Sequence, residues 1–212
     1  MAQTYNVDTP DRLLDSAEKL FSKRGYGAVT LSAIAQDAGA NVGQIVYHFA
    51  TKEELFNTCI LRRSNVLSRE RHTLLTSYTR LVGAKNVAIE PLIRAYVDPF
   101  FDKVRGGDEG WHNYSLLLAR VVWRENSAGT LAAGFNEVAI EFLKSFRTAL
   151  PDLSPDAAVR GFQFLLATLY SSVSDDKRIE LLTDGASRAA DYDAYYRFLI
   201  PFLAAGFERI AR

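Results

Sequence analysis

The chain of 212 residues is 48% hydrophobic and 24% charged, an ordinary globular composition that allows a large buried core. Its formal net charge of zero argues against a protein that binds any polyanion without regard to sequence, although a small DNA-reading domain needs only a few local cations. A single cysteine, Cys59, excludes an internal disulfide. The sequence shows no signal peptide and no apolar run of about 18 residues, so we expect a cytoplasmic protein that does not enter a membrane.

Helix signals follow one another along the chain, and no segment reads as a strand, so the predicted fold class is all-α. Thr9 and Pro10 start the first helix and Gly25 ends it, because proline suits a first helical turn and glycine a helix end. The predicted helices cover residues 9–24, 31–38, 42–49, 51–82, 91–104, 111–125, 129–150, 155–173 and 193–210. We expect two domains, over residues 1–55 and 56–212, with their boundary inside the long fourth helix.

The most specific signal lies near the N-terminus. Apolar residues at helical spacing fill residues 31–38, and Gly39 then ends that helix, because glycine takes the left-handed backbone without a Cβ clash. A second short helix over 42–49 follows, and Thr51 with Glu54 predicts a capping box at the start of the next one. Two short helices joined by a glycine-containing turn predict a DNA-binding helix-turn-helix.

This segment resembles the signature of the TetR family of transcription regulators, in which a turn glycine precedes a recognition helix that ends in Tyr-His-Phe. The matching residues are Gly39, Gly43, Tyr47, His48, Phe49, Thr51, Lys52, Glu53 and Leu55. The resemblance extends over residues 10–58. It implies a homodimeric repressor whose N-terminal domain binds a palindromic operator in double-stranded DNA. It also implies that the C-terminal domain binds an effector and dimerises.

Two kinds of DNA contact are expected. The resemblance implies that Thr30, Tyr47, His48 and Lys52 grip phosphates, although a partly buried core position is the alternative reading of the histidine. Base contacts should come from the exposed front of the recognition helix and the helix before it, since Asn and Gln amides can bond an adenine edge and Val can touch a thymine methyl. These candidates are Ser32, Gln36, Asn41, Val42 and Gln44, with Gly43 expected to allow a close backbone approach to DNA.

Two departures from the family pattern concern the strength of binding. Many relatives carry lysine where this chain has Val42 and an aromatic residue where it has Val46. Fewer cations predict a shallower salt dependence and weaker nonspecific binding.

The C-terminal half is rich in large aromatic residues, Trp123 among them. Two readings stay open: packing of a helical core, or an apolar pocket with a few polar anchors for a small hydrophobic effector. The candidate effector-binding residues are Tyr96, Phe100, Trp111, Tyr114 and Phe142, with Asn113 and Arg120 as further polar anchors. Residues 162–167 and 197–207 also resemble the branch of the family that contains fatty-acid-responsive, PsrA-type regulators.

The last two predicted helices indicate a homodimer. Residues 155–173 are apolar nearly all round, and residues 193–210 carry two apolar stripes. One stripe can pack on the chain's own bundle, and a second copy of the same helix pair is the simplest partner for the other. The expected interface residues are Phe162, Leu165, Leu169, Phe198, Phe202 and Gly206, with Gly161 and Ala205 allowing close approach of the backbones.

Catalytic motifs are missing from the sequence. The three histidines are scattered, and no nucleophile elbow, phosphate loop or dinucleotide fingerprint occurs, so we expect no catalytic residue, no metal site and no cofactor. Two alternatives to a ligand-responsive regulator are a DNA-binding module without an effector and a helical enzyme with an added helix-turn-helix.

Overall fold

A computed structural model describes residues 9–122, 124, 127–174 and 177–212, and within these ranges the chain is all-α. The helices are α1 (Thr9–Arg24), α2 (Leu31–Asp37), α3 (Val42–Phe49), α4 (Lys52–Val82), α5 (Ile89–Arg105), α6 (Glu109–Val121), α7 (Ala128–Ala149), α8 (Pro155–Ser171), α9 (Arg178–Leu182) and α10 (Tyr192–Ile210), with a 3₁₀ turn at Ala84–Asn86. This confirms the predicted fold class and the predicted helices. The sixth helix ends at Val121, earlier than predicted, while Trp123 and Glu125 lie outside the described residues.

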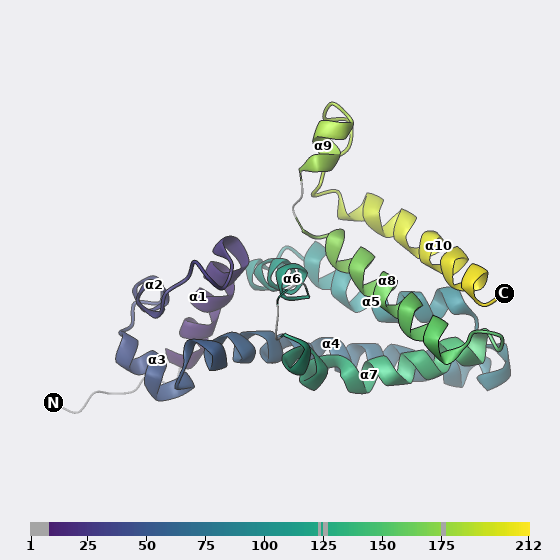
Figure 1. The fold of residues 1–212 in the computed structure, drawn as a ribbon, viewed down its shortest axis with the longest axis horizontal. Coiled ribbons are helices and arrows are strands. Elements are labelled where there is room, and N and C mark those ends of the chain that lie inside the picture. Colours follow the sequence, from purple (N-terminus) through teal and green to yellow (C-terminus); the bar gives the residue numbers. More distant parts are fainter. Residues whose placement is uncertain (1–8, 123, 125–126, 175–176) are drawn as a thin grey trace.

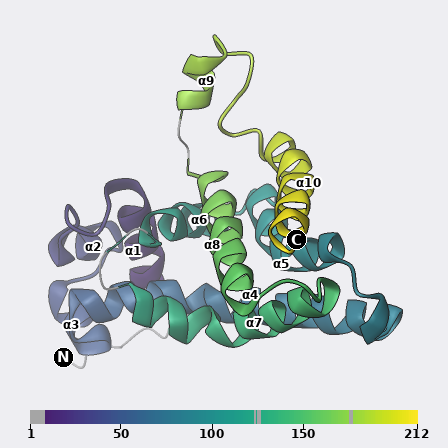
Figure 2. The same cartoon turned by 45° about the vertical axis from the view of Figure 1, so that its right-hand side comes forward.

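The helix α4 connects the two parts of the molecule. The group α1–α3 lies at one end, and α4 runs from it into the remaining helices with α7 beside it (Figures 1 and 2). Its 31 residues make a rod of about 46 Å at 1.5 Å per residue. The rod passes residue 55 without a break, so the boundary between residues 55 and 56 stays a prediction, and a rotation of the rod would carry α3 with it.

Small residues bring α4 and α7 close together. A Cβ on Gly134 would come within 2.8 Å of the Ser64 hydroxyl, so only glycine fits there without a shift. One turn further along α4, the Ser68 hydroxyl donates to the Gly134 carbonyl at 2.9 Å. The buried stripe of α4 facing its neighbours is Ile60, Ser64, Leu67, Arg71 and Leu75.

The C-terminal helix packs on α5 and α8. The Tyr196 hydroxyl donates to Asp98 at 2.7 Å and accepts from Arg94 at 3.0 Å, which fastens α10 to α5. A Cβ on Gly161 would come within 2.5 Å of the Phe207 ring, so this glycine serves the contact of α8 with α10 inside one protomer. Gly161 also lines the apolar groove between α8 and α10 together with Phe202 and Gly206, so its expected place in a dimer interface stays a prediction.

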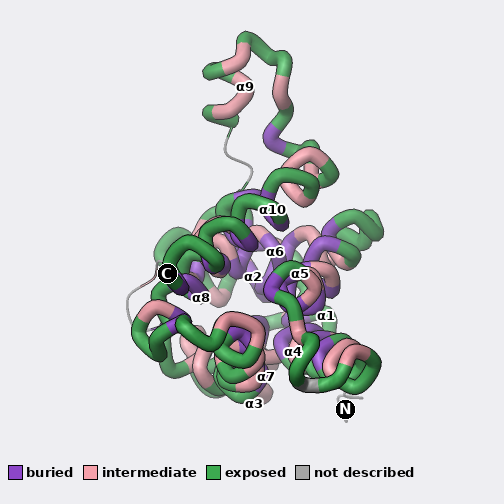
Figure 3. Tube along the Cα trace, turned by 90° about the vertical axis from the view of Figure 1, so that its right-hand side faces the viewer, coloured by how far each residue is buried: buried purple, intermediate pink, exposed green. Residues whose placement is uncertain are grey.

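The short helix α9 was not predicted, because five residues carry too little periodicity to be recognised. It stands away from the helical body (Figures 1 and 3), and Leu181 and Leu182 on it are exposed. In Figure 3 the buried parts of the trace lie on the inward sides of the other helices, so the core sits between α4, α5, α7 and α8.

Candidate functional site

The helix-turn-helix is held together by local caps and a small apolar core. Thr30 caps α2, its hydroxyl accepting from the Ala33 amide at 3.1 Å. Gly39 has φ +62°, the left-handed conformation predicted for it. Ile34 of α2 and Ile45 of α3 are fully buried, so the two helices are fixed against the rest of the N-terminal domain.

The start of α3 is a reciprocal capping box. The Asn41 side chain accepts from the Gln44 amide at 3.0 Å, and the Gln44 side chain accepts from the Asn41 amide at 3.1 Å. Asn41 and Gln44, two of the residues expected to contact bases, are therefore engaged in capping. Their side chains are less free to contact a base. A Cβ on Gly43 would meet the Asn41 carboxamide oxygen at 3.1 Å. This close contact with the cap favours glycine at position 43 without any contact to DNA. At Thr51 the structure shows half of the predicted box: its hydroxyl accepts from the Glu54 amide at 3.0 Å.

The outward face of the helix-turn-helix carries three large exposed side chains from α3. Tyr47 is 70% exposed, and Val42 and Val46 beside it on the same helix are also exposed. Ser32 on α2 is exposed as well, as is Gln36. The exposed residues named here offer apolar groups, hydroxyls and one carboxamide.

The remaining two expected phosphate contacts are less accessible. His48 is half-buried, and its Nε2 is enclosed without a hydrogen-bond partner among the described residues. Lys52 donates to the Tyr26 carbonyl at 2.6 Å, and its Nζ lies 4.2 Å from the centre of the Tyr26 ring. Burial lowers the pKa of Lys52, and nearby Arg124 lowers it further. In this arrangement Lys52 ties α4 to the turn after α1.

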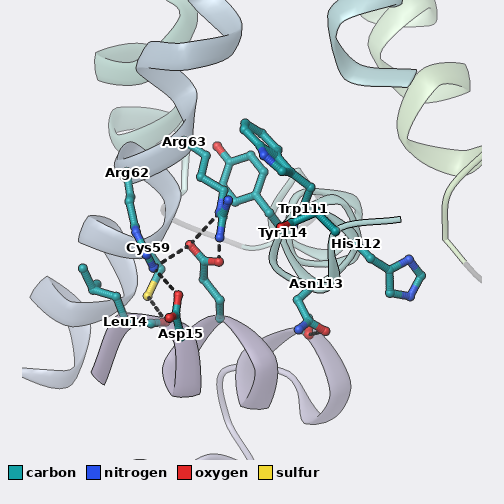
Figure 4. A network of polar contacts seen from close by, with 12 residues as sticks. Leu14, Asp15, Cys59, Arg62, Arg63, Trp111, His112, Asn113 and Tyr114 are labelled. Atoms are coloured by element: carbon teal, nitrogen blue, oxygen red, sulfur yellow. Dashed lines mark hydrogen bonds and ion pairs between the residues drawn. The ribbon is translucent and has the colours of Figure 1, made fainter. Parts of the chain in front are cut away.

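A polar network joins the N-terminal domain to α4 and α6 (Figure 4). Glu18 of α1 is almost fully buried and pairs with Arg63 at 3.1 Å and with Arg62 at 3.7 Å. Arg62 also pairs with Asp15 at 2.7 Å. Burial raises the pKa of Glu18 to about 7, and the two arginines only partly offset that rise.

Two residues expected to anchor an effector belong to this contact between domains instead. The Arg120 Nε donates to the Ser22 carbonyl at 2.7 Å, and the Ser22 hydroxyl donates to Asn113 at 3.4 Å. Both side chains of α6 therefore hold α1, and the expectation that they line an effector pocket is corrected.

A cavity of about 840 Å³ lies between α7 and α8. Its wall is mostly apolar and aromatic, and the residues that line it include Tyr96, Leu131, Phe135, Phe162, Leu166 and Tyr170, with Arg124 and Ser127 at one end. A volume of this size is in the range of small-molecule sites.

The five candidate effector residues are not gathered around this cavity. Tyr96 lines it, whereas Phe100, Tyr114 and Phe142 are fully buried in packing between helices. The Tyr114 hydroxyl donates to the Ile60 carbonyl at 2.7 Å, and Trp111 lies over the Arg63 guanidinium. Phe100, Trp111, Tyr114 and Phe142 thus serve the packing of the helices, which is one of the two interpretations that the sequence left open.

The candidate dimer residues divide into two sets. Phe198 is 73% exposed and Phe202 69% exposed, and Gly206 is exposed near them on α10. Phe162, Leu165 and Leu169 are buried within the protomer, where they pack in its own core, and an interface role for them stays a prediction. The exposed aromatic residue of α8 is Phe164, which was not among the candidates.

Sequence reasoning missed two features: the buried Arg71 on α4, and the Arg124–Glu53 ion pair. Arg71 stands at i+4 from Leu67 and i−4 from Leu75, so the spacing of the buried stripe was the signal that pointed to it. The Arg124–Glu53 pair joins residues 71 positions apart, which no local pattern reveals.

In the part of the chain that the structure describes, no group of three or more His, Cys, Asp or Glu side chains is placed to hold a metal ion. No helix in it has the length and apolar character required to span a bilayer.

Comparison with known families gives two matches. The profile described as "Bacterial regulatory proteins, tetR family" matches residues 13–59. The profile described as "Tetracyclin repressor-like, C-terminal domain" matches residues 94–206, which is more than half of the chain.

Curated relatives are similar mainly at the N-terminus. The regulator QacR of Staphylococcus aureus is 44% identical over 50 residues, 24% of this chain and 27% of that protein. The regulator UidR of Escherichia coli is 30% identical over 73 residues, 34% of this chain and 37% of that protein. The chain thus spans well under half the length of these relatives.

Solved structures share the whole fold at low identity. SmeT of Stenotrophomonas maltophilia, titled the repressor of a multidrug efflux pump, has a TM-score of 0.61 at 20% identity, covering 93% of this chain and 89% of that one. FadR of Bacillus halodurans, titled a fatty acid degradation regulator, has a TM-score of 0.57 at 16% identity, covering 93% and 97%.

Proposed function

The chain belongs to the TetR family of bacterial regulatory proteins, and from this premise we propose that it is a ligand-responsive transcriptional repressor that binds a palindromic operator as a homodimer. The observation that carries the proposal is the helix-turn-helix at the end of the α4 rod, with Val42, Val46 and Tyr47 turned outward. The relatives QacR and UidR are named as regulators of this helix-turn-helix type.

DNA binding in this proposal rests on shape and a few contacts. The Tyr47 hydroxyl and the open amides at the starts of α2 and α3 supply phosphate contacts, since helix N-termini favour anions. The valines supply apolar contact to thymine methyl groups in the major groove. This mode of binding needs few positively charged side chains. It is consistent with a chain whose formal net charge is zero.

The homodimer is supported by the α8–α10 face, defined here as Phe164, Phe198, Phe202, Gly206 and Ile210. Phe164 is 64% exposed, and it lines one shallow apolar groove together with Phe202, Gly206 and Ile210. Exposed apolar groups in one patch favour association, and a second copy buries them symmetrically. Two recognition helices about 34–36 Å apart then fit successive major grooves.

Ligand response is supported by the cavity between α7 and α8. SmeT, which has the same fold, is known in a complex titled with triclosan, a small aromatic molecule. A ligand that fits one arrangement of α4 and α7 shifts the population toward that arrangement and changes the spacing of the two α3 helices. The expected coupling is roughly 1–3 kcal/mol, the usual range for two linked sites.

The test is a selection of DNA fragments from the source genome by the purified protein, followed by sequencing. The proposal expects enrichment of a site with two inverted half-sites near the genes that it regulates. Binding of the enriched fragment is then titrated against a panel of small aromatic and lipid-like molecules. An operator whose binding no molecule changes would favour a DNA-binding module without an effector.

A further inference from the structure

One buried cation has no acidic partner. Arg71 on α4 is 0% exposed, and its Nε donates to the Tyr96 carbonyl at 2.8 Å. Its two terminal nitrogens, Nη1 and Nη2, are enclosed and have no hydrogen-bond partner among the described residues. Within the same ranges no carboxylate lies in ion-pair distance of Arg71, in contrast to Arg62 and Arg63, which lie more than two turns earlier on α4.

A guanidinium in this position is costly. It offers five donors and stays charged, so burial without an anion leaves most of its hydrogen-bonding capacity unused. Two aromatic rings partly compensate: the guanidinium carbon lies 3.8 Å from the centre of the Tyr96 ring and 5.8 Å from that of Phe135. Burial also raises the pKa of Tyr170, and Arg71 opposes that rise, which places the cation near a third ring.

These three rings are part of the wall of the α7–α8 cavity. Tyr96, Phe135 and Tyr170 all line it, so Arg71 stands directly behind the aromatic wall. Among the described residues that line the cavity there is no Asp and no Glu, and the one charged residue of this described lining, Arg124, is already paired with Glu53. Arg71 is not itself among the described lining residues, and it adds a positive charge without an acidic partner beside the aromatic wall.

We infer that the cavity between α7 and α8 takes an amphipathic anion, with an apolar body along the aromatic wall and a carboxylate or similar group bound by the Arg71 guanidinium. The fork of Nη1 and Nη2 matches the two oxygens of a carboxylate. This inference rests on the proposed effector function and narrows the ligand from a hydrophobic molecule to a negatively charged one.

Binding calorimetry on the full chain tests the inference with two pairs of probes, each pair sharing an apolar body and differing in an anionic or a neutral head group. The pairs are 1-naphthylacetate with 1-naphthylacetamide, and decanoate with decanol. The wild type should bind the anion of each pair at least about tenfold more tightly, because truncating a buried charge pair has effects of this size or larger. Arg71→Met, which keeps the volume and removes the charge, should reduce that preference to about twofold or less.

Two further variants separate charge from structure. Arg69→Met removes an exposed arginine two residues away on the same helix and should keep the wild-type preference. Arg71→Lys keeps the positive charge but loses the two parallel donors of the guanidinium, so it should retain part of the preference for the anion. Because the ligand-free Arg71 has no anion, Arg71→Met should melt at the same temperature as the wild type or higher.

Several results would overturn the inference. One is a wild type that binds both members of a pair equally, and another is an Arg71→Met variant that still prefers the anion. A variant that unfolds or melts well below the wild type would show that the guanidinium serves the ligand-free fold. Operator binding by the ligand-free wild type is measured separately, so a failure of the anion site is distinguishable from a failure of the proposed DNA-binding function.

Discussion

Arg124 and Glu53 form a two-pronged ion pair, with Nη1–Oε1 at 3.2 Å and Nη2–Oε2 at 2.9 Å. Arg124 lines the α7–α8 cavity, while Glu53 stands in the first turn of α4, directly after the helix-turn-helix. The guanidinium also lies 4.0 Å from the centre of the Tyr26 ring, whose carbonyl binds Lys52. This pair is a physical connection between the proposed ligand site and the DNA-binding domain.

Removing the charge at Glu53 should weaken that connection. In Glu53→Gln we expect ligand affinity in the absence of DNA to stay within about twofold of wild type, because Glu53 does not line the cavity. The ligand-induced fall in operator affinity should shrink by roughly 1 kcal/mol, since allosteric coupling is shared by the groups that connect the two sites. Titrations of operator with and without ligand give this difference. Glu54→Gln, an exposed neighbour, is the control and should couple like the wild type.

If Asn41 acts as the helix cap of α3, a substitution that removes the cap should change the stability of the fold. Asn41→Ser keeps an oxygen for the Gln44 amide and should leave thermal stability and operator affinity near wild type, because serine caps helices as well as asparagine. Asn41→Ala should lower the free energy of unfolding by about 1 kcal/mol and weaken DNA binding along with it. Loss of base discrimination by the serine variant at unchanged stability would instead make Asn41 a reader of bases.

The buried Glu18 predicts an unusual pH dependence. Its folded-state pKa of about 7 lies above the ordinary value of 4.5, so the folded chain holds this proton more tightly than the unfolded chain. The free energy of unfolding should therefore fall as pH rises from about 4.5 to about 7, and then level off. Glu18→Gln lacks this decline, so its stability relative to wild type should rise by up to roughly 3 kcal/mol between pH 5 and pH 8. Urea unfolding at both pH values measures it, and parallel curves for the two proteins would contradict it.

The α8–α10 face predicts the effect of a charge on assembly. Phe202→Glu should give a monomer, or aggregates, that no longer hold an operator with two half-sites, because the proposed interface would bury this exposed ring and leave a carboxylate there unpaired. Leu74→Glu on α4 is the matched control, since Leu74 is also an exposed apolar residue but lies outside this face. Sedimentation velocity at micromolar concentration compares the two. A wild type that is itself a well-behaved monomer would refute the dimer.

Local signals were enough to predict most of the fold. Helix starts and ends depend on neighbouring residues, as at Gly25, Gly39 and Thr51, so the sequence alone located them correctly. The helix-turn-helix was predicted for the same reason. Pairing of distant residues was not predictable in this way, and the sequence assigned Arg120 to an effector pocket although its partner is the carbonyl of Ser22, 98 positions away.

The candidate sites were predicted unevenly. An apolar stripe indicates that one face of a helix is buried, but not which element or molecule packs on it. For this reason the sequence assigned Leu165 and Phe202 to one interface, although Leu165 is buried in the protomer. Aromatic density likewise is found in a core and in a cavity wall, and the sequence did not show that Tyr96 lines the cavity while Phe142 packs in the core. The buried Arg71 was not predicted, because its isolation from acids depends on how the helices pack against one another.

The most direct test of the central claim, sequence-specific DNA binding through α3, is the ratio of affinities for the selected fragment and for the same fragment scrambled, measured at one fixed salt concentration. Specific recognition predicts a ratio of at least about 10³, and Tyr47→Phe should weaken both affinities while leaving the ratio nearly unchanged. Equal affinities of the wild type for the two fragments would contradict the account.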